Sequence, residues 1–178
     1  MRMHQRFATL AFCLALAPVA APTSALAATA GPVTSVAEGG RLVLYADDPV
    51  AGNELVIPDA GWYEHYVRTE KWVFTFHRKD NNYTIGLPDH DLCWHRDHQP
   101  DRTRVKVEAC GTARSARWIL DPVDDGDRVA VVRPAGRVNE ALTIGTASGH
   151  RWNHVVLRPY SELGIQHWQV PVEVGGGG

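Results

Sequence analysis

Helical periodicity is what this sequence of 178 residues lacks most clearly. No segment repeats apolar residues at spacings of three and four over roughly 11 residues, as an amphipathic helix requires. Short alternating or continuous apolar runs recur instead, and glycine, proline, aspartate and asparagine bound them. Examples are the runs at 41–46 and 154–158. The pattern therefore predicts an all-β protein.

Basic runs are also missing, and the formal net charge is −2. Proteins that bind nucleic acid or anionic membranes concentrate lysine and arginine in runs or patches. We therefore expect neither as a partner. Catalytic motifs are equally scarce, since Ser115, Ser148 and Ser161 lie outside any Gly-x-Ser-x-Gly turn and no phosphate-cradling glycine loop occurs. We expect no enzyme activity and no cofactor.

The N-terminus has the composition of a secretory signal peptide. Arg2 and Arg6 are basic, an apolar run extends from Phe7 to about Ala21, and Ala25-Leu26-Ala27 forms a small-x-small end. That run is too short to span a membrane. We predict a signal peptide at 1–28, a secreted β-domain at 29–174 and a flexible glycine tail at 175–178.

Cysteine is nearly absent from the expected mature chain. Cys13 lies inside the signal peptide, so Cys93 and Cys110 remain. An exported chain with one pair of cysteines is expected to oxidise it to a disulfide.

A repeat of about 50 residues organises the rest of the chain. Its expected core is a set of apolar residues at equivalent positions. These are Leu42, Leu92 and Leu142; Ile57, Val107 and Leu157; and Trp118 with Trp168, matched by Trp72 after a four-residue insertion. Each unit contains about four strand signals. A propeller of such blades needs more units than three, so we predict a β-trefoil with the three tryptophans near its axis.

The second unit carries the strongest motif. It runs as Leu92-Cys93, a polar turn, a strand from Val105 to Cys110, and a closing Trp118, and the third unit has Gln166-His-Trp168. This layout resembles a lobe of the ricin-B-type lectins. The resemblance implies a β-trefoil fold and carbohydrate binding.

The sugar-binding residues of that family are not in their expected places. The family has an aspartate two residues after the first cysteine, an aromatic residue two before the second, and an asparagine before Gln-x-Trp. Here the first place holds His95, with Tyr45 and Gly145 as equivalents; the second holds Glu108, with Pro58 and Arg158; the third holds Ser115, with Ile165. No unit has the full set, so the resemblance implies the fold rather than the site.

Histidine and aspartate crowd the second unit at His90, Asp91, His95, Asp97 and His98. Their types suit zinc or copper, but the histidine spacing does not follow a standard ligand period. We interpret the segment as a polar hairpin loop and predict no metal site.

Aromatic side chains in loops are the better candidates for binding. Trp62, Tyr63, His65 and Tyr66 lie within five residues, and Trp152 follows Arg151 in a later loop. The candidate ligand-binding residues are Trp62, Tyr63, Tyr66, His95, Glu108 and Trp152. The alternative is that Trp62 and Tyr66 fold back as a lid over the barrel.

The sequence therefore predicts a secreted, monomeric binding module whose partner is a glycan. One alternative is a trefoil proteinase inhibitor that presents the loop 58–68 to an extracellular protease. Another is a receptor-binding subunit of a secreted assembly.

Overall fold

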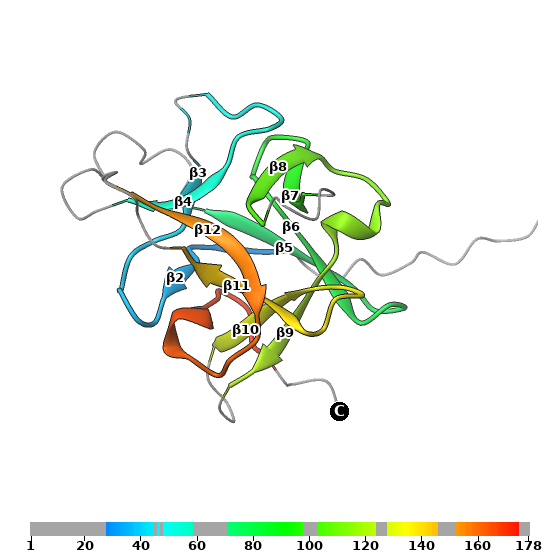
Figure 1. Cartoon of the computed structure of the whole chain (residues 1–178). Helices are drawn as coiled ribbons and strands as arrows, with labels where there is room; N and C mark the ends of the chain where they lie inside the picture. Colours follow the sequence, from blue (N-terminus) through cyan, green and yellow to red (C-terminus); the bar gives the residue numbers. More distant parts are fainter. Residues whose placement is uncertain are drawn as a thin grey trace, which may run out of the picture.

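The computed structural model describes residues 28–44, 46, 48–58, 71–97, 103–123, 128–145 and 152–174. The predicted glycine tail, and all of the predicted signal peptide except Ala28, lie outside these residues. The described part is all-β and contains no α-helix, apart from the short 3-10 segments η2 (Arg114–Ala116) and η3 (Gly164–Gln166) (Figure 1). The predicted fold class is confirmed. No helix in the described part is both long and apolar enough to cross a membrane.

Within the described residues, strands follow the three predicted units, with four in each. The first unit has β2 (Thr34–Ser35), β3 (Val43–Leu44), β4 (Leu55–Pro58) and β5 (Trp72–His77). The second has β6 (Asn82–Gly86), β7 (Leu92–Arg96), β8 (Val105–Ala109) and β9 (Trp118–Pro122). The third has β10 (Val129–Pro134), β11 (Glu140–Ile144), β12 (Trp152–Pro159) and β13 (His167–Gln169). One additional strand, β1 (Thr29–Gly31), precedes them.

The first and last strands of each unit form a closed barrel. Its order is β1-β5-β6-β9-β10-β13-β2, and neighbouring strands in this order are antiparallel. β1 and β2 are two parts of one barrel strand, since only Pro32 and Val33 separate them. A proline cannot donate a ladder hydrogen bond, and the two parts pair on opposite sides, with β5 and with β13.

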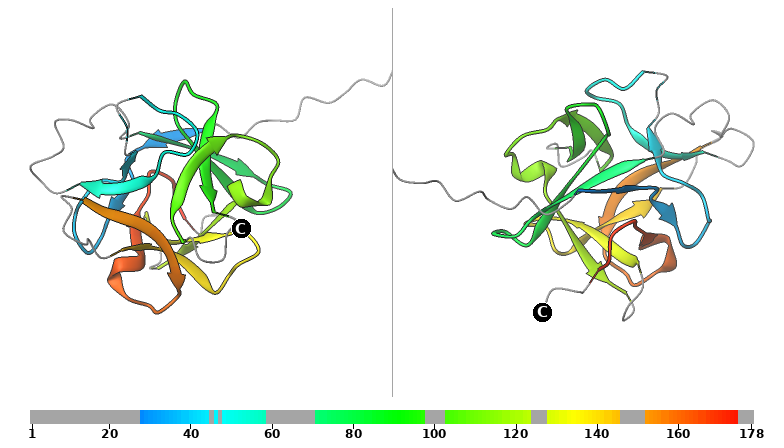
Figure 2. Two further views of the ribbon diagram at one scale, coloured as in Figure 1. Left: turned by 45° about the horizontal axis from the view of Figure 1, so that its top comes forward. Right: turned by 180° about the vertical axis from the view of Figure 1, so that it is seen from behind.

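The middle strands of each unit form hairpins, β3–β4, β7–β8 and β11–β12. Figure 2 shows these hairpins, drawn in cyan, green and orange, arranged around a common centre. β12 also pairs with β4, which joins the third hairpin to the first. Six barrel strands and three hairpins make a β-trefoil, as the repeat predicts.

Three tryptophans fill the centre and make the same contact in each unit. Trp72, Trp118 and Trp168 are fully buried. Their indole Nε1 atoms donate hydrogen bonds to the carbonyl oxygens of Leu42, Trp94 and Leu142 at 3.0, 3.0 and 2.9 Å respectively. The recurrence confirms that these tryptophans are core residues and gives each one a polar partner for its N–H.

Those hydrogen bonds also correct the predicted repeat. Trp94, not Leu92, is the equivalent of Leu142, because Trp94 pairs with Val107 as Leu142 pairs with Leu157. Trp94 is fully buried, whereas Leu92 is half-buried at the margin of the core. Leu92, which the sequence predicts as a core residue, packs against the edge of the core, and Trp94 takes the central position. Leu92 and Trp94 face the same side of one strand, so alternation alone does not distinguish them.

The remaining predicted core residues, Leu42, Ile57, Val107, Leu142 and Leu157, are all at most 5% exposed. Trp94 enlarges the aromatic centre. Its ring meets those of Trp72 and Trp118 edge-on, with centroids 5.0 and 6.0 Å away, an arrangement that aromatic quadrupoles favour.

The predicted disulfide Cys93–Cys110 is present and joins β7 to the end of β8. Its sequence separation of 17 residues corresponds to about 3 kcal/mol of stabilisation in the chain-entropy estimate. Gly86 lies against it. A Cβ at that position would lie 3.0 Å from the Leu92 carbonyl oxygen and 3.1 Å from Cys93 Sγ, so a larger residue would push the bridge away.

Candidate functional site

The aromatic loop lies outside the described residues. Trp62, Tyr63 and Tyr66 belong to 59–70, and the structure describes only Pro58 of the loop 58–68. Their binding role stays a prediction, and so does the lid alternative.

His95 is a buried structural residue. It is 8% exposed, and its Nδ1 lies 3.1 Å from Ser115 Oγ, which joins hairpin strand β7 to η2. The third unit has a similar contact, in which Gln166 Nε2 donates to Thr143 Oγ1 at 2.9 Å. Both contacts hold the segment before the closing strand against the hairpin. The structure therefore gives His95 a packing role.

Glu108 and Trp152 are half-buried on different hairpins. The Glu108 carboxylate lies 3.0 Å from Lys106 Nζ. Trp152 begins β12 opposite Pro58. Glu108 is on the strand next to that of His95, whereas Trp152 is on the third hairpin.

The corrected register also changes which residues of the first and third units correspond to the family's aspartate position. Because Trp94 is equivalent to Leu142, His95 is equivalent to Thr143 rather than Gly145, and to Val43 rather than Tyr45. None of these residues is an aspartate. The departure from the family's sugar site holds in the corrected register as well.

Among the described residues, no group of three or more histidine, cysteine, aspartate or glutamate side chains is placed to hold a metal ion. His98, the last histidine of the crowded segment, lies outside them.

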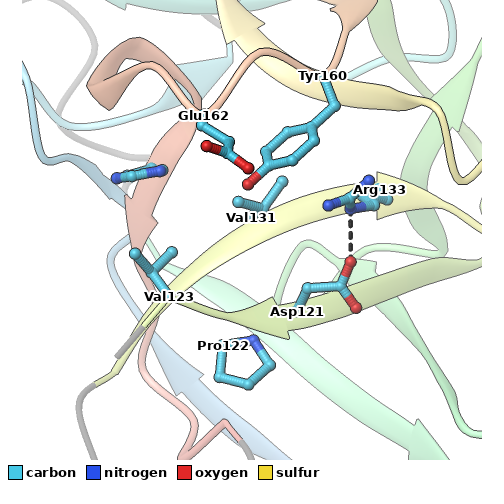
Figure 3. A pocket seen from close by; sticks show the side chains of 8 residues that line it. Asp121, Pro122, Val123, Val131, Arg133, Tyr160 and Glu162 are labelled. Atoms are coloured by element: carbon cyan, nitrogen blue, oxygen red, sulfur yellow. Dashed lines mark ion pairs between the residues drawn. The ribbon is translucent and has the colours of Figure 1, made fainter. Parts of the chain in front are cut away.

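A cavity of about 270 Å³ opens beside the barrel in the third unit, and we call it the Arg133 pocket (Figure 3). It lies where the hairpin β9–β10 meets the segment between β12 and β13. Val131 and Arg133 are two positions apart on β10 and therefore lie on the same outer face, because successive strand residues point to opposite sides. Its lining is formed by Asp121, Pro122, Val123, Val131, Arg133, Tyr160, Glu162 and His167.

Arg133 is held in place by three contacts. Its Nε lies 2.5 Å from Asp121 Oδ2, and its Nη1 donates to the carbonyl oxygen of Val138. Its guanidinium carbon lies 4.1 Å from the centroid of the Tyr160 ring, a cation–π contact. An arginine fixed in this way presents its remaining N–H groups in a defined direction, at little further cost in side-chain entropy.

Two carboxylates border the same cavity. In Figure 3, Glu162 lies beside the Tyr160 hydroxyl, and Asp121 lies beyond Arg133 on β9. Glu162 has φ of 54°, a left-handed conformation that is uncommon for a residue with a Cβ. Two carboxylates and one guanidinium give the pocket a negative balance. Val123 and Val131 add an apolar wall.

Sequence patterns do not reveal this pocket, because its residues come from the β9–β10 hairpin and from a segment about 30 residues later. One signal for it is visible only in the corrected alignment of the units. Tyr160 is equivalent to Cys110, since their N–H groups bond to the equivalent carbonyls of Asn139 and Asp91. Arg133, paired with Ile119, is likewise equivalent to Gly86, paired with Val73. The third unit therefore has an arginine–tyrosine stack where the second has its disulfide.

The chain matches no protein-family model and no curated protein sequence. It is similar in structure to a mosquitocidal holotoxin, with a TM-score of 0.67 and 11% identity, over 81% of this chain and 17% of that chain. It is similar to the Rhizoctonia solani agglutinin, with a TM-score of 0.62 and 17% identity, over 86% and 97% of the two chains. It is also similar to the C-half of an earthworm R-type lectin in complex with GalNAc, with a TM-score of 0.56 and 12% identity, over 79% and 95%.

At these identities the likeness shows the fold alone. A lectin and an agglutinin among these structures agree with the ricin-B-type architecture that the second unit resembles. The chain spans about a sixth of the holotoxin chain that it matches.

Proposed function

We propose that this protein is a secreted, monomeric glycan-binding module without catalytic activity, and that the Arg133 pocket holds one sugar ring. The observation that carries the proposal is the pairing of two carboxylates with a fixed arginine and an aromatic ring in one small cavity. The similar fold of an R-type lectin in complex with GalNAc supports it.

The size and chemistry of the pocket suit a monosaccharide. Its volume of about 270 Å³ lies just below the range of roughly 300–1,000 Å³ typical of sites for drug-sized ligands. Carboxylates accept hydrogen bonds from hydroxyl groups, and a guanidinium donates them. Asp121 and Glu162 are the acceptors for sugar hydroxyls, and Arg133 is the donor. Val123 and the Tyr160 ring provide the apolar surface for the sugar's C–H groups.

A glycan array followed by calorimetric titration of the best neutral ligand tests this proposal. Glu162→Gln is the key variant, because Glu162 is exposed and its replacement leaves the Arg133–Asp121 pair intact. Loss of one charge-assisted hydrogen bond should weaken binding about tenfold or more. Glu173→Gln removes the charge of another exposed carboxylate that does not line the pocket, and should bind normally.

Equal affinity of the Glu162→Gln variant and the parent would rule out this pocket, and a silent array would rule out glycan binding itself. The proteinase-inhibitor alternative depends on the loop 58–68, of which the structure describes only Pro58. It therefore stays a prediction, as does the receptor-binding alternative.

A further inference from the structure

A second cavity, of about 490 Å³, lies beside the barrel in the second unit, and we call it the Arg114 pocket. Asp80 and Asn82 reach it from the β5–β6 turn, Thr112 and Arg114 from the segment after β8, and Gly136 from the β10–β11 turn. These three segments meet at the right side of the molecule in Figure 1. None of the family's sugar-binding positions in this unit lines the cavity.

The Arg114 pocket occupies the same kind of position as the Arg133 pocket but has the opposite charge. Each lies between a barrel hairpin and the segment that precedes a closing strand. Each includes the residue just before the closing tryptophan, which is Arg117 here and His167 in the third unit. Arg114 and Arg117 outweigh Asp80, so this pocket has a positive balance.

Arg117 is fixed by a chain of hydrogen bonds. Its Nη1 donates to Thr84 Oγ1 at 2.8 Å, and that hydroxyl also lies 2.5 Å from His77 Nε2. These contacts anchor one edge of the guanidinium to the barrel wall. Arg114 is exposed at the start of η2 and lines the same cavity as Arg117.

Asn82 lines the cavity, but its amide oxygen is buried. The residue is 7% exposed, and its Oδ1 is buried without a hydrogen-bond partner. Its Nδ2 donates to the Asp80 carbonyl oxygen at 3.2 Å, which fixes the orientation of the amide, since a flipped amide would set two oxygens against each other. The amide oxygen has almost no accessible surface, so a ligand in the cavity does not reach it. Asp80 lines the same cavity and is exposed, so its carboxylate is the acceptor that a ligand can reach.

We infer that the Arg114 pocket binds an acidic sugar, with its carboxylate or sulfate between Arg114 and Arg117 and a ring hydroxyl donating to the Asp80 carboxylate. A bare inorganic anion would satisfy the arginines but not the Asp80 carboxylate, because it has no hydroxyl to donate. The inference rests on the proposed glycan-binding function and adds a second ligand class to it. The bridge Cys93–Cys110 anchors the segment that carries Thr112 and Arg114.

Titration of the full chain with matched probes tests the inference. Glucuronate and glucose differ by one carboxylate, glucose 6-sulfate replaces it with a sulfate ester, and inorganic sulfate lacks the sugar. We expect glucuronate or the sulfated sugar, and not glucose, to bind the parent, with affinity falling as salt rises. Arg114→Glu should weaken that binding at least about tenfold.

Arg158→Glu is the control, because Arg158 is exposed on β12, lines neither pocket and changes the net charge equally. Arg114→Gln provides a milder variant if charge reversal perturbs folding, which circular dichroism would detect. Unchanged binding by either folded Arg114 variant would overturn the inference. Equal affinity for glucose, or for inorganic sulfate, would also overturn it.

The two sites can fail separately. Glu162→Gln should weaken neutral glycans and leave glucuronate binding unchanged, whereas Arg114→Glu should do the reverse. An array on which acidic sugars bind and neutral sugars do not would therefore reject the Arg133 pocket as a sugar site and support the Arg114 pocket.

Discussion

Replacing Leu142 or Leu92 with alanine distinguishes the structural register from the even 50-residue spacing of the sequence. Leu142 is fully buried, and its carbonyl accepts the Trp168 indole hydrogen bond, whereas Leu92 is half-buried at the margin of the core. Leu142→Ala should cost about 3 kcal/mol of unfolding free energy, since buried leucine deletions combine lost transfer energy with a cavity. Leu92→Ala should cost about 1 kcal/mol, because solvent already reaches the side chain.

Urea unfolding followed by tryptophan fluorescence measures both values. The slopes should agree with that of the parent, which shows that the same surface is exposed on unfolding. Thermal midpoints should fall by about 2–4 °C per kcal/mol for a domain of this size, which separates the two variants clearly. A loss for Leu92→Ala equal to or larger than that for Leu142→Ala would refute the assignment of Trp94 as the core equivalent.

Three further changes have defined outcomes. The double replacement Cys93→Ala, Cys110→Ala should lower the unfolding free energy measured in urea by about 3 kcal/mol. A reducing agent should lower the unfolding free energy of the parent by a similar amount and leave that of the double variant unchanged. Gln166→Ala should lower the unfolding free energy by about 3 kcal/mol in calorimetry, because the buried Gln166 amide bonds to Thr143 and also to the backbone of Pro159 and Ser161. Thr143→Val removes only one of these hydrogen bonds and should lower it by about 1 kcal/mol, so equal losses would contradict this arrangement. Burial, and then Arg117, lower the pKa of His77 below its usual value of 6.5, so the unfolded chain binds this proton more readily than the folded chain. The contribution of His77 to stability should be full above about pH 6.5 and should be lost as the pH falls from there through the lowered pKa. Urea titrations at several pH values should show this dependence in the parent and not in His77→Gln.

Local patterns were sufficient for the fold. The closing tryptophans Trp72, Trp118 and Trp168 mark the end of each unit, and the cysteine pair marks one hairpin, so the strand count and the threefold arrangement follow from the sequence. The register of the second hairpin did not follow. Leu92 and Trp94 lie on the same side of β7, and only the indole hydrogen bond from Trp118 shows which one occupies the centre.

The candidate sites were beyond sequence reasoning for a different reason. Asp121 precedes a proline, Arg133 precedes another, and Tyr160 follows a third, so in the sequence each resembles an ordinary residue beside a turn. They meet only because the barrel brings β9, β10 and the end of β12 together. Burial also reassigned His95, which sequence position suggested as a ligand contact and which instead packs against Ser115.

The two-part first barrel strand has a consequence for how the molecule is made. β2 bonds to β13, so the earliest strands of the chain must wait for the last one before the cylinder is complete. β2 is synthesised early and β13 late, and contacts between strands that are far apart in the sequence form slowly. A nascent or shortened chain that lacks β13 would leave β2 and β10 with open edges, which invite pairing with other molecules. Protection from aggregation in this protein is therefore acquired at the final step of its folding.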